Sequence, residues 1–540
     1  MLTDRHANLE AQPAASKQDA DRLHELGYDQ DLKRGWSTLE SFGSSFSVIS
    51  VCTGITTSFL LGLTNGGPGT MAVGWICVSF MTMFVAASMA EVVSAVPSAG
   101  GPMHWAALLA RPRYSAFAAY STGWFNFLGQ AAVTTGIVFG NANLIATLAS
   151  LHGFESSPAR IVGIHAGLLF FAGTVNSVSV GVLAHLNRLS ILLHSVGVFS
   201  LGVAVLAKAP THMSAKEVFG TFYDGSGDPG WSVRASPAYV AVTGILLAQY
   251  TITGFDASAH MAEETADAGR AAPRGVLISV GASALFGLFY LLSLLFSMQS
   301  FERAVNSDQP VLEIFIDVFG KTGATVAMAF IICCVTLCGT FSVTSNSRMF
   351  YAFSRDSGIP RWFDYVDKRT QAPFRTVWLA VVLAFILALP SLGSSVAFTA
   401  VTSIATIGLY ISYAIPIAIA GVDQKRFREV RGPFHLGALS RPVALIATAY
   451  VVFITVVFCL PTANPVDIDT LNYAPVAVGI VIVWIVASWL CGMRKVFHGP
   501  HQGSLAELGD KDKVARVVSE EKKLQSVGEA DGSIAQVLSR

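Results

Sequence analysis

Long apolar stretches alternate with short polar connections along most of the chain. Most of the stretches approach or exceed the about 20 apolar residues that an α-helix needs to cross the hydrocarbon core of a bilayer. The pattern therefore predicts an all-α, polytopic membrane protein with twelve transmembrane helices. The predicted spans are 36–63, 67–90, 114–150, 160–182, 188–208, 237–260, 274–299, 322–347, 375–394, 398–420, 441–461 and 473–493.

The two ends of the chain are polar and lack an apolar helical face. We expect residues 1–34 and 496–540 to be cytosolic tails around a membrane domain of residues 35–495. The even-numbered connections between spans hold sixteen Lys and Arg residues and the odd-numbered ones hold six. Positive charge accumulates in cytoplasmic loops, so the even-numbered connections and both termini are expected in the cytosol. The plasma membrane is the expected location, with the vacuolar membrane second.

Two polar interruptions stand out inside predicted spans. In the sixth span, Thr253-Gly254-Phe255-Asp256 comes four residues after an apolar run from Tyr239 to Ala248. A carboxylate at membrane mid-depth costs about 2.5–3.5 kcal/mol on insertion scales, so Asp256 is expected to face a cavity or a partner. Non-helical backbone is tolerated at that depth only where protein or a water-filled cavity covers it. This stretch therefore predicts a broken helix that lines a binding site.

The first span carries a similar interruption, Cys52-Thr53-Gly54, followed by two threonines. Thr53 and Gly254 are 201 positions apart, about the length of five spans. Broken helices at matching positions of two halves are typical of transporters built from inverted repeats. We expect a five-plus-five core with repeats at about 36–208 and 237–420 and broken helices 1 and 6. A small-residue packing seam remains an alternative for Cys52-Thr53-Gly54.

Composition supports the membrane assignment and narrows the function. Charged residues make up 13% of the 540 residues, against about 25% in soluble proteins. The formal net charge is zero, so the charge gives no reason to expect a nucleic acid partner. We find no zinc-protease, nucleophile-elbow or phosphate-loop motif, and expect neither an enzyme nor a cofactor. No metal-type cysteine spacing occurs, so helix packing is expected for all seven cysteines: Cys52, Cys77, Cys333, Cys334, Cys338, Cys459 and Cys491.

Several motifs resemble those of a known group of permeases. They are Cys52-Thr53-Gly54, Ala99-Gly100-Gly101-Pro102, Gly254-Phe255-Asp256-Ala257-Ser258-Ala259-His260 with Glu263-Glu264, and Tyr351-Ala352-Phe353-Ser354-Arg355-Asp356-Ser357-Gly358-Ile359-Pro360. Over roughly residues 28–495 the chain resembles the amino acid–polyamine–organocation superfamily, and within it the eukaryotic amino acid/choline/GABA permease branch. Cys52 departs from the glycine that is more usual there.

The expected site chemistry follows from the two breaks. A substrate carboxylate needs unpaired amides, which the start of the outer half-helix after Cys52-Thr53-Gly54 would supply. The substrate ammonium needs unpaired carbonyls, which the ends of the broken helices would supply. The predicted substrate-binding residues are Cys52, Thr53, Gly54, Thr57, Tyr250, Thr253, Gly254, Phe255 and Asp256.

The resemblance also implies coupling and gating residues, each with a structural alternative. Tyr250 and Phe255 match aromatic gate positions, or serve ordinary packing. Asp256 matches a proton-sensitive position, or is a hydrogen-bonded structural carboxylate. His194 would supply a titratable group on span 5 beside Thr344 and Ser345 of span 8. Its structural alternative is an ordinary packing residue of an apolar helix. We further expect Glu263 and Glu264 to form an inner gate with Arg348 or Arg355, and Glu91 to pair with Arg34 or Arg113. The pocket is expected to include Trp124, Asn126 and Gln130. An outer gate is expected at Tyr410 and Tyr413.

These observations favour a secondary active transporter (permease) for an amino acid or related amine such as GABA. Alternating access and proton coupling are expected, with protons, the small amine and the lipid bilayer as partners. A choline or polyamine permease is the alternative, because Tyr250, Phe255 and Trp124 would form an aromatic box for an organic cation. A transporter-like nutrient sensor is a further alternative, which the short tails disfavour.

Overall fold

The computed structural model describes residues 36–178, 180–367, 369–393, 397–468, 470–497 and 499–500. Within these ranges the protein is helical almost throughout, and its only β-structure is a pair of isolated bridges. The expected tail 1–34 and nearly all of the expected tail 496–540 lie outside the described residues. The all-α prediction is confirmed for the described part of the chain.

Eleven helices of the described residues are long and apolar enough to cross a membrane. They are α3 with α4 (Thr38–Ile49, Val51–Thr64), α5 (Gly67–Ala95), α7 (Pro112–Ser150), α8 (Pro158–Val178), α9 with η1 and α10 (Val180–Leu192, Leu193–Gly197, Val198–Lys208), α16 (Ala268–Ser297), α18 (Pro310–Arg355), α19 with η4 (Phe374–Ala388, Leu389–Leu392), α20 (Ala397–Val422), η5 with α22 (Gly437–Leu439, Ser440–Val457), and α23 with η6 and α24 (Ala474–Ser488, Trp489–Met493, Arg494–Val496).

The predicted span 237–260 is divided in the structure. It forms α13 (Pro237–Gly244), α14 (Leu246–Thr251) and α15 (Ala257–His260), followed by the 3-10 turn η2 (Ala262–Glu264). None of these pieces is long enough to cross a membrane alone, which is why the structure has eleven candidate spans where the sequence predicts twelve. The total of twelve and the inverted-repeat symmetry stay predictions.

Other boundaries differ because polar residues continue some helices. The helix α18 extends well beyond the predicted 322–347, with a kink at Gly320 (φ 70°). Arg348 and Arg355, which we counted in a connection, lie on its last turns, and Arg188 lies inside α9. Short helices occupy several connections: α6 (Pro102–Leu109), α11 (Ala215–Gly220), α12 (Trp231–Arg234), α17 (Phe301–Val305), η3 (Arg361–Phe363) and α21 (Gln424–Glu429).

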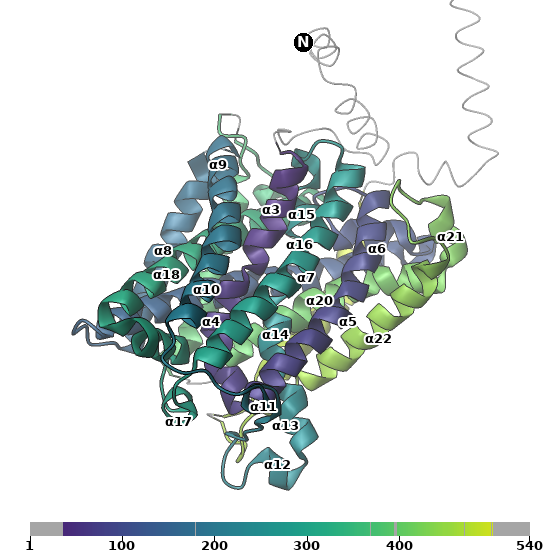
Figure 1. Ribbon diagram of the computed structural model, residues 1–540. Coiled ribbons are helices and arrows are strands. Elements are labelled where there is room, and N and C mark those ends of the chain that lie inside the picture. Colours follow the sequence, from purple (N-terminus) through teal and green to yellow (C-terminus); the bar gives the residue numbers. More distant parts are fainter. Residues whose placement is uncertain are drawn as a thin grey trace, which may run out of the picture. The chain divides into compact units, whose positions relative to one another are not determined.

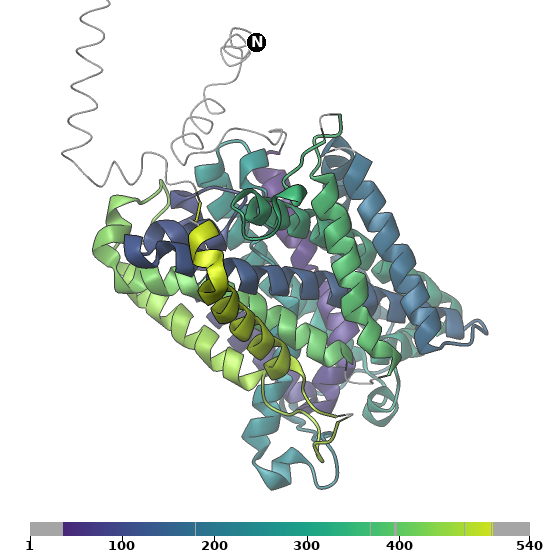
Figure 2. The ribbon, with the colours of Figure 1, turned by 180° about the vertical axis from the view of Figure 1, so that it is seen from behind.

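The long helices pack around α7 and α16. The helix α7 contacts α20, α18 and α8, whereas α16 contacts α5 and α3. The helices of the even-numbered connections, α6 and α21, lie toward the upper end in Figure 1, and α11, α12 and α17 lie at the lower end. Figure 2 shows α23, in yellow, on the rear face. Even and odd connections thus lie at opposite ends, and which end faces the cytosol stays a prediction.

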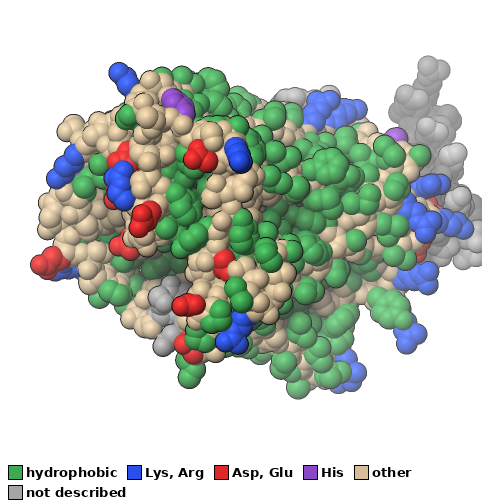
Figure 3. All heavy atoms as spheres, turned by 60° about the horizontal axis from the view of Figure 1, so that its bottom comes forward, with side chains coloured by type: hydrophobic (Ala, Val, Ile, Leu, Met, Phe, Trp, Pro, Cys, Tyr) green, Lys and Arg blue, Asp and Glu red, His purple; other side chains and the backbone are tan. Residues whose placement is uncertain are grey.

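The surface between the two ends is rich in exposed apolar side chains. Phe80, Leu285 and Val483 are each about two thirds exposed or more, at 64%, 73% and 67%. Figure 3 shows hydrophobic side chains across the middle of one face, with most charged side chains toward its left and right ends. Apolar surface of this extent is unusual on a soluble monomer, and it fits contact with lipid.

Candidate functional site

The first predicted span is interrupted at Ser50. This residue separates α3 from α4 and has a left-handed backbone (φ 37°, ψ 76°), which is uncommon outside glycine. Its hydroxyl lies 2.5 Å from Thr53 Oγ1 and 2.7 Å from His194 Nε2, and these contacts hold the turn. The break therefore precedes the predicted Cys52-Thr53-Gly54 triplet by two residues.

The triplet itself forms the first turn of α4. The Ser50 carbonyl accepts hydrogen bonds from the amides of Thr53 (2.8 Å) and Gly54 (3.2 Å). These two amides are therefore not the free donors expected from the sequence. The amides of Val51 and Cys52 come before the first intrahelical bond, where a helix leaves its N–H groups without a backbone acceptor. They lie at the positive end of the α4 dipole.

The second interruption lies between α14 and α15. The helix α14 ends at Thr251 and α15 begins at Ala257. Between them Gly254 has φ 92°, a conformation that glycine adopts without steric cost. The hydroxyls of Thr251 and Thr253 donate to carbonyls of α14, each at 2.6 Å. Polar groups of the segment itself thus replace part of the lost helical hydrogen bonding.

The helix α3 supports this second interruption from the side. The Ser45 hydroxyl donates to the Phe255 carbonyl at 2.8 Å and accepts from the Ser258 amide at 2.9 Å. Before α3 begins, the Trp36 amide donates to the Glu264 carbonyl at 3.0 Å. The two interrupted segments are therefore held directly against each other, a contact between residues about 210 positions apart.

The two interruptions face each other across a narrow cavity. A Cβ added to Gly54 would lie 2.7 Å from Thr251 Cα, and one added to Gly254 would lie 2.7 Å from Val48 Cγ1. The cavity has room for little more than a water molecule. It is lined by Val48, Ile49, Thr53 and Gly54, by Val133 and Ile137 of α7, and by Tyr250, Thr251 and Thr253.

The structure places the other predicted substrate-binding residues around this cavity rather than in its wall. Cys52 points toward His194 and α18. The Thr57 hydroxyl donates to the Thr53 carbonyl at 2.8 Å, one turn along α4. The Phe255 ring packs against Tyr413 with the ring centroids 5.3 Å apart.

Asp256 is fully buried between α15 and α7. Its Oδ2 accepts hydrogen bonds from Gln130 Nε2 at 2.9 Å and, more weakly, from Asn126 Nδ2 at 3.4 Å. Both amides lie on α7, where the sequence predicted pocket residues. His260 Nε2 lies 3.1 Å from the same oxygen. The carboxyl group is thus surrounded by polar side chains, with no Lys or Arg among these hydrogen-bond partners.

His260 was not singled out from the sequence, but it lies directly beside Asp256. Its Nδ1 lies 2.8 Å from the Ala99 carbonyl, which can only accept, so Nδ1 carries a hydrogen. Asp256 and His260 therefore form a buried carboxyl–imidazole pair.

The aromatic residues divide into separate groups. The Tyr410 hydroxyl donates to the Ile252 carbonyl at 3.2 Å, so Tyr410 contacts the interrupted segment itself. Tyr250 borders the cavity. Trp124 instead packs against Phe353 and Trp484, with centroids 5.5 and 5.6 Å away. Within the described residues, Trp124 lies in a different aromatic group from Phe255, so the expected box of three rings is not assembled.

Two buried ion pairs lie at the end that we predict to be cytosolic. Glu264 Oε1 lies 2.8 Å from Arg348 Nε, and Glu263 Oε1 lies 2.9 Å from Arg355 Nη2. Burial alone would raise the pKa of Glu263, but the Arg355 guanidinium and the Ala99 amide more than offset it, so the pKa is lowered. The structure thus forms the expected pairs. Glu91 lies 3.8 Å from Arg431, on the segment after α21. Of its two expected partners, Arg34 lies outside the described residues.

We expect Arg355→Gln to destabilise the protein markedly. Removal of one partner of a buried ion pair costs about 3–5 kcal/mol because the other charge stays buried. Thermal unfolding of the purified protein measures the effect. The double variant Glu263→Gln with Arg355→Gln should regain part of the loss, and Arg303→Gln, in an exposed pair with Asp317, is the control. A double variant less stable than the single one would contradict the assignment.

His194 occupies a different neighbourhood from the one expected. It lies in the π-helical turn η1 and is buried against Ser50 of the first interruption. The predicted partner Thr344 donates instead to Asn176 Oδ1 of α8 at 2.6 Å. The α18 residue beside His194 is Cys334, ten positions earlier and nearly three helical turns away from Thr344.

The fold and the site define a polytopic membrane permease with a buried cavity between two helix interruptions. The family model described as amino acid permease matches residues 37–486. The chain belongs to this amino acid permease family, within the superfamily that the motifs indicated.

Similar proteins come from plants and fungi. The amino-acid permease BAT1 of Arabidopsis thaliana is 42% identical, covering 89% of this chain and 95% of its own length. Its homolog from Oryza sativa subsp. japonica is 41% identical with the same coverage. The GABA-specific permease of Saccharomyces cerevisiae is 31% identical, covering 90% of this chain and 86% of its own length.

Proposed function

We propose that this protein is a secondary active transporter that moves an amino acid or a related amine such as GABA by alternating access, coupled to protons. The observation that carries the proposal is the contact of two interrupted helices around one cavity beside a buried carboxyl–imidazole pair. Family membership supports amino acid transport. The names of the relatives, two amino-acid permeases and one GABA-specific permease, support this substrate class.

Recognition of the substrate would use the helix ends. The amides of Val51 and Cys52, in the first turn of α4 at the positive end of its dipole, suit a carboxylate. The carbonyls at the ends of α3 and α14 suit an ammonium group. The cavity is too small for an amino acid in this conformation, so binding requires the two interrupted helices to move relative to α7.

The packing suggests which parts move. The helix α16 packs closely against both α3 and α5, and α7, α8 and α18 contact one another. We propose that the first group, with α4, α14 and α15, rocks against the second. The ion pairs Glu263–Arg355 and Glu264–Arg348 would open when the cavity opens at that end.

Protonation of the Asp256–His260 pair would couple this motion to a proton gradient. The pair lies directly after the second interruption and is hydrogen-bonded to Gln130 of α7, so a change in its charge would act on α15 and on α7, which lines the cavity. A carboxyl group and an imidazole at this depth are costly unless water or substrate reaches them during the cycle. We further propose cytosolic termini and a plasma membrane location, with the vacuolar membrane second.

Uptake into proteoliposomes tests the function. We expect labelled amino acid or GABA to accumulate under an imposed inward proton gradient, and a protonophore to abolish the accumulation. Choline and a polyamine are the comparison substrates, and accumulation of these alone would support the organic-cation alternative. Binding without accumulation of any of these solutes would support a sensor and contradict transport.

A further inference from the structure

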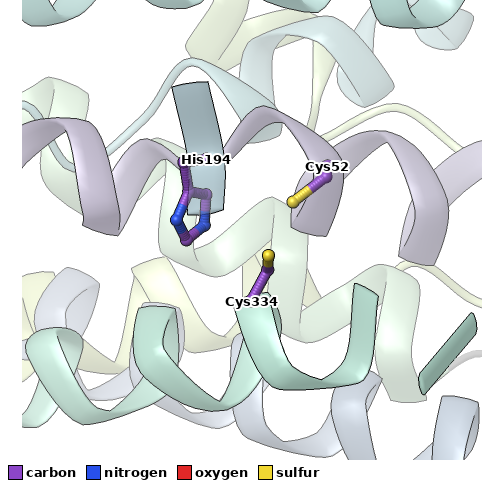
Figure 4. A group of neighbouring side chains, drawn as sticks. All are labelled: Cys52, His194 and Cys334. Atoms are coloured by element: carbon purple, nitrogen blue, oxygen red, sulfur yellow. The ribbon is translucent and has the colours of Figure 1, made fainter. Parts of the chain in front are cut away.

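Three potential metal-binding side chains meet beside the first helix interruption. The Sγ atoms of Cys52 and Cys334 and a ring nitrogen of His194 all lie within 4.8 Å of one another. The side chains come from α4, η1 and α18 and point toward one another (Figure 4). All three are buried, with at most 1% of each residue exposed. The sequence predicted no metal site at these side chains, because the histidine is more than 130 positions from either cysteine.

The hydrogen bonds of His194 prepare it for coordination. Its Nδ1 lies 2.8 Å from the Ser190 carbonyl, which can only accept, so Nδ1 carries the hydrogen and Nε2 keeps a lone pair. A metal-bound histidine is normally oriented by such a bond from its other nitrogen. His194 also lies in a π-helical turn, a feature often found at functional sites.

We propose that Cys52, His194 and Cys334 form a zinc site. Two thiolates and a neutral imidazole are a ligand set that Zn²⁺ prefers, with metal–ligand bonds of about 2.0–2.3 Å in tetrahedral geometry. Binding forms two Zn–S bonds and one Zn–N bond and releases the two thiol protons to solvent. The resulting centre has no net charge, which suits its burial within the membrane domain.

Ser50 fits the fourth coordination position. Its hydroxyl lies 2.7 Å from His194 Nε2 and 3.6 Å from Cys52 Sγ. When the metal takes the Nε2 lone pair, the hydroxyl hydrogen bonds to Thr53 Oγ1, already 2.5 Å away. A bound ion would tie α4 and the interruption at Ser50 to η1 and α18. If the protein transports as proposed above, on which this consequence rests, zinc would hold the moving helices against the fixed ones and slow uptake.

Metal binding to the purified full-length protein tests the site without reference to transport. The protein is reduced, stripped with a chelator and titrated with ZnCl₂ against a chromogenic chelator, and in parallel with CoCl₂. We expect a single high-affinity ion per chain and, in the wild-type cobalt form, a thiolate-to-cobalt charge-transfer band with tetrahedral d–d absorption. Cys334→Ser and His194→Gln should each weaken binding about tenfold or more, since even outer-shell changes cost that much.

Cys333→Ser is the matched control, because this cysteine neighbours Cys334 on α18 but is exposed. The proposal would be overturned if Cys333→Ser and Cys334→Ser lost metal affinity equally. A wild-type cobalt spectrum without thiolate charge transfer would also overturn it. The wild-type spectrum requires no variant to fold. In proteoliposomes, zinc should slow uptake by the wild type but not by Cys334→Ser, each compared with its own metal-free rate. If wild-type uptake were unchanged with zinc bound, zinc would not hold the moving helices against the fixed ones.

Discussion

Asp256→Asn is expected to abolish proton-driven accumulation while leaving substrate exchange partly intact. The amide has nearly the same shape as the carboxyl group, and its oxygen can still accept from Gln130. His260 Nε2 contacts the same Oδ2 position as Gln130, so the amide can keep only one of these two hydrogen bonds. Because the variant loses the ionisable carboxyl group but keeps its size and part of its hydrogen bonding, we expect gradient-driven uptake to fall about tenfold or more, a change of about 1.4 kcal/mol or more.

The measurement compares net uptake under a proton gradient with counterflow exchange in the same proteoliposomes. Asp317→Asn is the control, since Asp317 belongs to an exposed ion pair of the kind that contributes little. Uptake should be measured over about pH 5 to 8, the range in which a histidine changes charge. Equal uptake by wild type and Asp256→Asn throughout that range would remove Asp256 from coupling.

Gly54→Val should remove most substrate binding without preventing membrane insertion. The added Cβ would lie 2.3 Å from Thr251 Oγ1 and 2.7 Å from Thr251 Cα. The hydroxyl can rotate away, but Cα belongs to the backbone, so α4 and α14 must separate. Overpacking of this kind costs about 1–3 kcal/mol, which corresponds to about a tenfold to hundredfold loss of affinity.

Binding can be measured by thermal shift with the transported substrate, and insertion by the size-exclusion profile of the detergent-extracted protein. Gly163→Val in α8 is the control, because an added Cβ there meets no atom within 4 Å. Gly254→Val provides a second test, since valine is strained at φ 92°. Retained affinity in both site variants would place the substrate elsewhere.

The sequence alone indicated the fold class and the location of the second interruption. Apolar length is a local property, so most spans could be placed within a few residues. Thr253-Gly254-Phe255-Asp256 cannot continue a lipid-facing helix, and the helix is indeed interrupted there. The motifs around Asp256 and Arg355 were sufficient to indicate the permease superfamily.

The first interruption could be placed only approximately. Glycine and small residues drew attention to Cys52-Thr53-Gly54, but the chain turns at Ser50. A serine in left-handed conformation depends on partners, here Thr53 and His194, and the latter lies 144 positions away. Sequence patterns do not show such a contact, although the hydroxyl-rich run around Ser50 was visible.

The sequence by itself determined that this chain is an all-α membrane protein of the permease superfamily, because hydrophobic length and backbone-breaking residues act locally. Only the tertiary structure decided which polar side chains meet: His260 with Asp256, Arg431 with Glu91, and His194 with two cysteines. The last two contacts join residues on different segments of the chain. In the first, the distant Ala99 carbonyl orients the His260 ring toward Asp256. They depend on helix packing and rotation in three dimensions, which the order of residues along the chain does not specify.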